Sequence, residues 1–226
     1  LGVATDDAMA DEDVGGSLEE VVLPGLESSS RTLYVGHVEA NDRLLQITET
    51  EARLFSWAGE ILSTWTGAIT VASANEAGQV ALLKGGMVVC LEIVSDRVEK
   101  LYERQMVREV SCIDVHPFSK SKEASSMDVD GSVSKSSLVA VGLWDDYTVR
   151  LMSIAQGMED LDVIDLSTIE TEETEEPTSP SRGNRNNMMA RSLCLVTLDF
   201  SSTGTHGGKQ SSQGVDMLFV GLGDGT

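Results

Sequence analysis

The side chains that most often carry acid–base and metal chemistry are few in this sequence. It has three histidines, His37, His116 and His206, and no two of them stand at the spacing of a metal-binding pair. Neither a Cys-x-x-Cys nor a His-Glu-x-x-His motif occurs. Each histidine is therefore expected to be structural or exposed to solvent, and we expect no metal, no other cofactor and no catalysis.

The three cysteines also favour a structural role. Cys90, Cys112 and Cys194 are an odd number at wide spacing, and apolar residues flank each of them. This pattern predicts buried free thiols in a reducing compartment rather than a disulfide framework.

Two further patterns of chemically capable residues are weak. Segment 203–209 resembles a phosphate-binding loop, but Thr203 replaces the first glycine and no Ser or Thr follows the lysine. Carboxylates are plentiful, but sixteen of the 37 acidic residues lie in two runs, 1–20 and 159–176, that contain no basic residue. Acids in such runs are expected to be solvated, so nothing there would shift a pKa for catalysis.

Charge and hydropathy exclude two classes of partner. The net charge is −21, from 37 acidic and 16 basic residues, and a dominant negative charge repels phosphate backbones. We therefore expect no direct binding of nucleic acid by this segment. No apolar run approaches the ~20 residues that cross a bilayer, so no membrane partner is expected either. Because the chain starts at Leu1 and stops at a turn sequence, we expect a piece of a longer protein.

The elements that must position any site are short strands. Apolar, β-branched runs recur about every ten residues, and none keeps a helical period over three turns. This pattern predicts an all-β, antiparallel fold. The expected strands cover 32–38, 44–48, 52–57, 69–74, 80–84, 87–93, 110–115, 138–142, 148–154, 192–200 and 217–221, with weaker ones at 61–65, 98–101 and 161–166.

These strands fall into units of four at a spacing of roughly 40 residues, which is typical of β-propeller blades. The sequence thus predicts a partial propeller of the seven-bladed type with about three and a half four-stranded blades. A β-sandwich with the same number of strands is the alternative. We expect an acidic, disordered segment at 1–20 and the partial propeller at 21–226. Disordered loops are expected at about 119–137, 170–187 and 201–214.

Two residues in the connections between strands are candidate sites. Trp144 lies at the tip of the hairpin at 142–147, where small polar residues are usual. It either folds back onto its own blade or is presented to a partner, and exposed aromatic residues are frequent interaction hot spots. In the loop at 170–187, Ser179 precedes a proline and is a candidate for proline-directed phosphorylation, although such dipeptides are common in loops.

Short motifs spread over the strand frame carry a family resemblance. They are Leu-Gln-Ile-Thr at 45–48 followed by Ala-Arg-Leu at 52–54, Val-Ser-Cys-Ile-Asp-Val-His-Pro at 110–117, Gly-Leu-Trp-Asp at 142–145, Ala-Arg-Ser at 190–192 and Leu-Gly-Asp-Gly at 222–225. In this order they resemble the DNA damage-binding protein 1 family, the large propeller adaptors of cullin-4 RING ubiquitin ligases. The resemblance covers about 21–226, with the three loops inserted.

The resemblance implies a function and a site. This segment is similar to the middle propeller of the family, which docks a cullin scaffold protein, while other parts of the full-length chain bind substrate-receptor proteins. A tryptophan at this hairpin tip and a glutamate before Val-x-Cys-x-Asp contribute to the cullin contact, and they correspond to Trp144 and Glu109. Asp145 and Asp146, beside the tryptophan, are candidate hydrogen-bonding residues of the same contact. The implied setting is ubiquitination and the DNA damage response, in the nucleus and cytoplasm.

Two alternatives remain open. Asp-Tyr-Thr-Val-Arg at 146–150 resembles a segment of related propeller subunits in splicing and pre-mRNA cleavage complexes, such as splicing factor 3b subunit 3. A propeller enzyme would need His, Asp or Arg around the central channel on several blades, but the first strands of the blades are apolar, as at 110–113 and 193–198. Co-purification of a cullin rather than spliceosomal subunits distinguishes the ligase adaptor from the first alternative.

Overall fold

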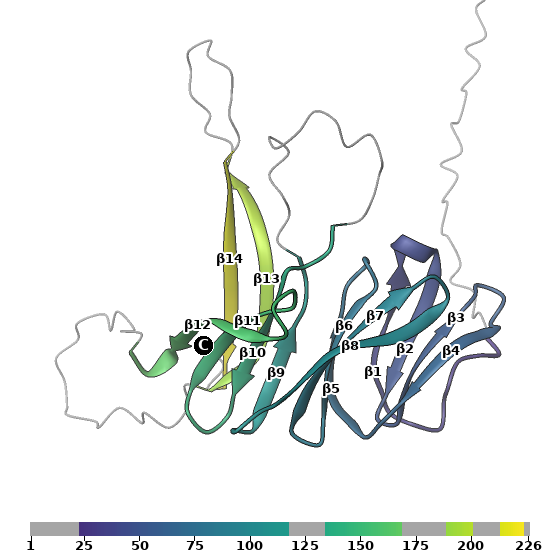
Figure 1. The fold of residues 1–226 in the computed structure, drawn as a ribbon, viewed down its shortest axis with the longest axis horizontal. Coiled ribbons are helices and arrows are strands. Elements are labelled where there is room, and N and C mark those ends of the chain that lie inside the picture. The colour runs from purple at the N-terminus through teal and green to yellow at the C-terminus, as the bar shows by residue number, and fades with distance from the viewer. Residues whose placement is uncertain (1–22, 118–133, 169–188, 201–212, 224–226) are drawn as a thin grey trace, which may run out of the picture.

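The strands of this protein form consecutive antiparallel sheets. The computed structural model describes residues 23–117, 134–168, 189–200 and 213–223. Within these ranges there are three four-stranded sheets and one two-stranded sheet. The sheets stand side by side like successive blades (Figure 1). This arrangement confirms the prediction of an all-β, partial propeller with three and a half blades.

Each sheet is a meander, because strands that follow one another in the chain also pair with one another. Two short 3-10 turns, η1 (Glu39–Asn41) and η2 (Leu166–Thr168), lie between strands. The first sheet contains β1 (Thr32–Val38), β2 (Arg43–Thr48), β3 (Glu51–Phe55) and β4 (Ile61–Thr66), and the second contains β5 (Ile69–Ala74), β6 (Gln79–Lys84), β7 (Met87–Val94) and β8 (Arg97–Gln105). The third contains β9 (Val110–Asp114), β10 (Leu138–Leu143), β11 (Thr148–Ser153) and β12 (Glu159–Asp165), and the last contains β13 (Ala190–Phe200) and β14 (Gln213–Leu222).

The burial of a strand depends on its position in the sheet. The middle strand β6 is buried from Gln79 to Leu83, because neighbouring sheets cover both of its faces. The outer strand β8 instead places exposed residues between half-buried Val98, Leu101 and Arg104. Middle strands therefore show continuous apolar runs in the sequence, whereas the outer strands β4, β8 and β12 gave only the weak signals.

Apolar cores fill the spaces between successive sheets. They are built from alternate residues of facing strands, so each core depends on two sheets being in contact. The core between the first and second sheets includes Leu45, Leu54, Leu82 and Val89; that between the second and third includes Val88, Val141 and Met152; that between the third and the two-stranded sheet includes Cys112, Val149, Leu166 and Ala190.

A buried carboxylate connects the innermost strands β5, β9 and β13. Asp114, at the end of β9, accepts hydrogen bonds from Ser73 Oγ in β5 at 3.2 Å and from the backbone N–H of Leu195 in β13 at 2.6 Å. Its Oδ1 also lies 2.5 Å from Nδ1 of His116. One side chain thereby links three sheets.

Several turns gather at one edge of the molecule. Because consecutive strands alternate in direction, the β2–β3, β6–β7 and β10–β11 turns share an edge with the β8–β9 connection, at the bottom of Figure 1. We call this edge the turn face. It comprises residues 49–50, 85–86, 106–109, 144–147 and 166–168.

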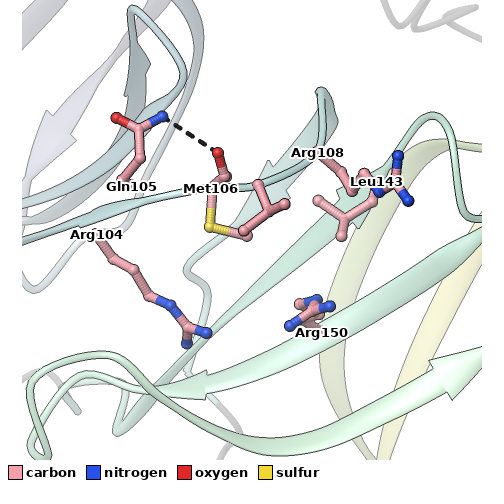
Figure 2. Close-up of a pocket in the computed structure, with 7 residues that line it drawn as sticks. Arg104, Gln105, Met106, Arg108, Leu143 and Arg150 are labelled. Atoms are coloured by element: carbon pink, nitrogen blue, oxygen red, sulfur yellow. Dashed lines mark hydrogen bonds between the residues drawn. The ribbon is translucent and has the colours of Figure 1, made fainter.

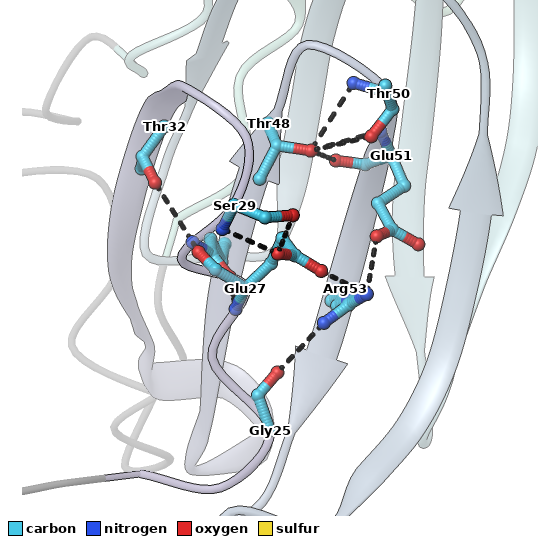
Figure 3. Close-up of polar contacts among 9 residues, drawn as sticks. Gly25, Glu27, Ser29, Thr32, Thr48, Thr50, Glu51 and Arg53 are labelled. Atoms are coloured by element: carbon cyan, nitrogen blue, oxygen red, sulfur yellow. Dashed lines mark hydrogen bonds and ion pairs between the residues drawn. The ribbon is translucent and has the colours of Figure 1, made fainter.

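A polar network attaches the residues before β1 to the first sheet (Figure 3). Nη2 of Arg53 forms ion pairs with Glu27 at 3.0 Å and with Glu51 at 2.6 Å. The buried side chain of Gln46 donates a hydrogen bond to the carbonyl of Glu27 at 2.8 Å. Residue 27 is thus held by two strands of the sheet, β2 and β3.

The prediction of three buried cysteines is correct for two of them. Cys90 and Cys112 are buried free thiols, and burial raises the pKa of the Cys90 thiol to about 12. For Cys194 the prediction is wrong, because this residue is exposed. Leu193 packs toward the third sheet, so the next residue along β13 points to the opposite face, which no described sheet covers.

Some sequence predictions concern residues outside the described ranges. These are the acidic segment 1–20, His206, Ser179 and most of the three expected loops. Of the loop expected at 201–214, Gln213 and Gly214 belong to β14. In the part of the chain that the structure describes, no helix is long and apolar enough to cross a membrane.

Candidate protein-docking site

The turn between β10 and β11 has a well-defined backbone. Oδ1 of Asp146 accepts hydrogen bonds from the N–H of Thr148 at 3.3 Å and from its hydroxyl at 2.7 Å. Tyr147 adopts a positive φ of 54°, and its carbonyl accepts a hydrogen bond from the N–H of Leu166 at 2.9 Å. The carboxylate of Asp146 therefore serves the turn itself, whereas Asp145 is exposed and makes no hydrogen bond to any described residue.

Trp144 and Glu109 adjoin on the turn face, although they lie far apart in the sequence. The backbone N–H of Trp144 donates a hydrogen bond to the carbonyl of Glu109 at 2.8 Å. This bond continues the pairing of β10 with β9 by one residue. Two residues predicted for one contact are thus brought together, and the side chain of Glu109 is exposed beside the tryptophan.

The indole of Trp144 is held by the last sheet. The guanidinium of Arg191, in β13, lies over the ring at 4.5 Å from its centre, which is a cation–π contact. The tryptophan is nevertheless 36 % exposed. It is therefore neither folded fully onto its blade nor free in solvent, but is oriented by one neighbour with part of its surface open. Arg191 was missed as a site residue, although its Ala-Arg-Ser motif contributed to the family resemblance.

A small pocket lies between the second and third sheets, at the turn face (Figure 2). It is on the opposite face of the third sheet from the indole of Trp144, because Leu143 packs into the core of the second and third sheets whereas Trp144 contacts Arg191 of the last sheet. Its volume is about 40 Å³. Sites for drug-sized molecules occupy several hundred Å³, so this pocket is much smaller than such a site. It is lined by Arg104, Arg108 and Arg150 and by Met106, Val107 and Leu143.

The contacts of Asp160 correct one prediction about the acidic run at 159–176. Acids there were expected to be solvated, but Asp160 is held between Arg104 and Arg150 at 2.7–3.0 Å. The hydrogen bonds from Arg104, followed by the charges of both arginines, lower the pKa of Asp160 despite its partial burial. For Asp160 the prediction was wrong, because residues 159–165 form β12, which brings this carboxylate against two neighbouring strands. Glu159, Asp162 and Asp165 of the same strand are exposed, as expected.

The pair of buried Asp114 and exposed His116 does not form a catalytic arrangement. A triad would require a nucleophile bonded to the histidine, but the hydroxyl of Ser73 donates to Asp114 instead. Among the described residues there is also no cluster of three or more His, Cys, Asp or Glu side chains that would hold a metal ion.

Consecutive four-stranded antiparallel meanders standing side by side define a β-propeller. Residues 13–226 match the family described as RSE1/DDB1/CPSF1 second beta-propeller, so the chain belongs to this family. The match confirms the family resemblance drawn from the sequence motifs.

The relatives of the chain carry a consistent name. DNA damage-binding protein 1 of Oryza sativa subsp. japonica is 31 % identical over 152 residues, and that of Drosophila melanogaster is 30 % identical over 145 residues. These alignments cover 65 % and 62 % of this chain but only 12 % of each relative. Among solved structures, Sqt1 of Saccharomyces cerevisiae aligns with a TM-score of 0.44 and 16 % identity, over 60 % of this chain and 36 % of Sqt1.

Proposed function

We propose that this chain is the cullin-docking propeller of an adaptor subunit of a cullin-4 RING ubiquitin ligase, acting in ubiquitination and the DNA damage response. The observation that supports this most is the position of Trp144, which is partly exposed on the turn face and bonded through its backbone to Glu109. In the sequence resemblance, these two residues correspond to the cullin contact. Their adjacency in space is what a single contact requires.

The surroundings of Trp144 suit an interface anchor. Large aromatic side chains dominate the binding energy of many interfaces, with polar residues at the rim. Here Glu109 and Asp145 are exposed at the rim. Because Arg191 already orients the indole, little side-chain entropy would be lost when a partner covers it.

The full-length protein is proposed to be a scaffold without enzymatic activity. Substrate-receptor proteins are expected to bind parts of it outside this segment. Direct contact with nucleic acid by this segment is not expected, because its net charge of −21 opposes phosphate groups. We expect the protein in the nucleus and cytoplasm, and Ser179 remains a candidate phosphorylation site.

The alternative is a subunit of a splicing or pre-mRNA cleavage complex. Its support is the pentapeptide at 146–150, but each conspicuous residue of that segment has a role inside the blade. Asp146 caps the turn, Val149 is buried in a core, and Arg150 pairs with Asp160. Because contacts within the blade account for these residues, the pentapeptide does not favour one partner over another.

The test is to identify what co-purifies with the tagged full-length protein from its own cells. We expect a cullin, and we expect Trp144→Ala to lose the cullin while retaining substrate receptors. Trp57→Ala is the matched control, since Trp57 is 53 % exposed but lies in the β3–β4 connection, at the edge opposite the turn face. Recovery of splicing or cleavage subunits in place of a cullin would establish the alternative.

A further inference from the structure

We propose that the partner docking on Trp144 inserts an aspartate or glutamate side chain into the arginine-lined pocket that opens at the same turn face, across the third sheet from the tryptophan. The inference rests on the function proposed above, because it assigns the chemistry of the partner at the same site. Three properties of the pocket support it: its charge, its size and its position relative to the tryptophan.

The pocket contains more positive charge than its own carboxylate neutralises. Nη1 and Nη2 of Arg104 bind the two oxygens of Asp160 at 2.7 and 3.0 Å, and Nη1 of Arg150 binds the same carboxylate at 2.9 Å. Arg108 is exposed and forms no hydrogen bond or ion pair with any described residue. Two guanidinium groups thus share one carboxylate and the third has no partner among the described residues, in a chain whose net charge is −21.

One of these guanidinium groups is incompletely satisfied. Nε of Arg150 is buried and has no hydrogen-bond partner within the described ranges. An unpaired buried N–H group costs free energy, so Asp160 alone does not compensate Arg150 fully. Figure 2 shows Arg108 and Arg150 on one side of the pocket with Leu143 between them, and Arg104 on the other side. A second carboxylate would therefore be attracted by cationic groups on both sides.

The size and charge of the pocket together determine which partner side chain it would bind. A volume of about 40 Å³ is enough for a carboxylate. The three arginines disfavour a lysine or arginine at close range, since like charges repel. Val107, at the rim, is 95 % exposed and offers an apolar contact to the stem of the entering side chain. Aspartate and glutamate are the residues that meet these conditions.

The pocket and the tryptophan lie on opposite faces of the third sheet but both adjoin the turn face. Arg108 lines the pocket, and the next residue, Glu109, is bonded through its carbonyl to Trp144. A partner that covers the turn face would engage both, with an acidic residue on one side of the third sheet and an apolar one on the other. The long-range negative charge of the chain does not prevent this, because interactions between exposed charges are screened beyond about 8 Å at physiological salt.

The experiment measures the affinity of the full-length protein for a purified cullin-4 N-terminal domain. We expect Arg108→Glu to raise the Kd at least about tenfold at low salt, and we expect this difference to shrink as the salt concentration rises. Arg97→Glu is the control, because Arg97 is an exposed arginine at the opposite end of β8. This substitution changes the net charge by the same amount as Arg108→Glu. Its Kd should stay within about twofold of the wild type.

A reversed charge on the partner completes the test. Acidic surface residues of the cullin domain are changed to lysine one at a time, and one of them should restore binding to Arg108→Glu. If Arg108→Glu behaves like Arg97→Glu, or no reversal restores binding, the inference is overturned. Loss of binding by Trp144→Ala in that same case would leave the proposed function standing. A wild-type protein that does not bind the cullin would overturn both.

Discussion

Asp114 and Trp144 lie toward opposite ends of the third sheet, and each contacts the last sheet. Asp114 is buried, and its oxygens accept hydrogen bonds from Leu195 in β13 and from Ser73 in β5. Trp144 is partly exposed, and the guanidinium of Arg191 lies over its ring. The same two sheets are therefore joined by a buried polar contact at one end and a half-open aromatic contact at the other.

This difference separates stability from binding. The carboxylate of Asp114 accepts hydrogen bonds from groups of the protein itself, so its removal leaves buried donors without partners. The contacts of Trp144 leave part of the indole open, with exposed Arg108 and Glu109 nearby. Changes at the first end should weaken the fold, and changes at the second should weaken association.

The largest effect is expected from Asp114→Ala. The buried N–H of Leu195 and the hydroxyl of Ser73 lose their acceptor, which should lower the free energy of unfolding of the propeller by roughly 2–5 kcal/mol. Thermal unfolding of the full-length protein and hydrogen exchange of β13 measure this. Unchanged protection of β13 would show that Asp114 does not join the sheets.

Trp144→Ala should produce the second largest effect, on binding alone. We expect a loss of about 2–4 kcal/mol in cullin affinity, a rise in Kd of roughly 30- to 1,000-fold, because the anchor of the interface is removed. Titration calorimetry with the full-length protein measures the Kd, and the thermal midpoint should remain that of the wild type. The comparison with Asp114 would fail if Trp144→Ala unfolded the propeller or if Trp57→Ala weakened binding equally.

Arg191→Ala should have a smaller effect on the same affinity. The cation–π contact orients the indole, and its loss at a partly exposed site should cost about 0.5–1 kcal/mol of binding. Arg191→Lys retains a cation over the ring and should recover part of the affinity. Equal loss in both variants would mean that Arg191 contacts the partner directly rather than positioning Trp144.

The smallest effect concerns the pH dependence of stability at the Asp114 end. The hydrogen bond to Asp114 raises the pKa of His116, although partial burial of the ring acts to lower it. For Asp114, burial acts to raise the pKa, but hydrogen bonds, led by the one from His116, lower it. The His116 contribution is therefore complete below the ordinary value of 6.5 and is lost as the pH rises through the raised pKa. The Asp114 contribution is lost only in acid, as the pH falls through its lowered pKa.

Thermal unfolding of the full-length protein between about pH 6 and 9 tests this dependence. The wild type should lose a small part of its advantage over His116→Gln as the pH rises. A constant difference between the two proteins across this range would contradict the assignment.

Much of the fold could be predicted from local pattern. The apolar middle strands, such as β6 and β7, were recognised because two sheets cover them, and the weaker outer strands β4, β8 and β12 were still placed correctly. Of the candidate site, Trp144 and Glu109 were predicted through the family resemblance, and the structure brings them together. The arginine-lined pocket was missed, because Arg104, Arg150 and Asp160 come from three different strands.

The sequence by itself determined the alternation, spacing and number of strands, and hence the blades, because the period of apolar residues is a property of each segment. It also indicated the exposed tryptophan, since a large aromatic residue at a hairpin tip is unusual. Only the tertiary structure decided which side chains meet across blades: Arg191 over Trp144, Asp160 between two arginines, and Asp114 among three sheets. These contacts join residues of distant sequence positions, and their geometry depends on how adjacent sheets pack rather than on any local pattern.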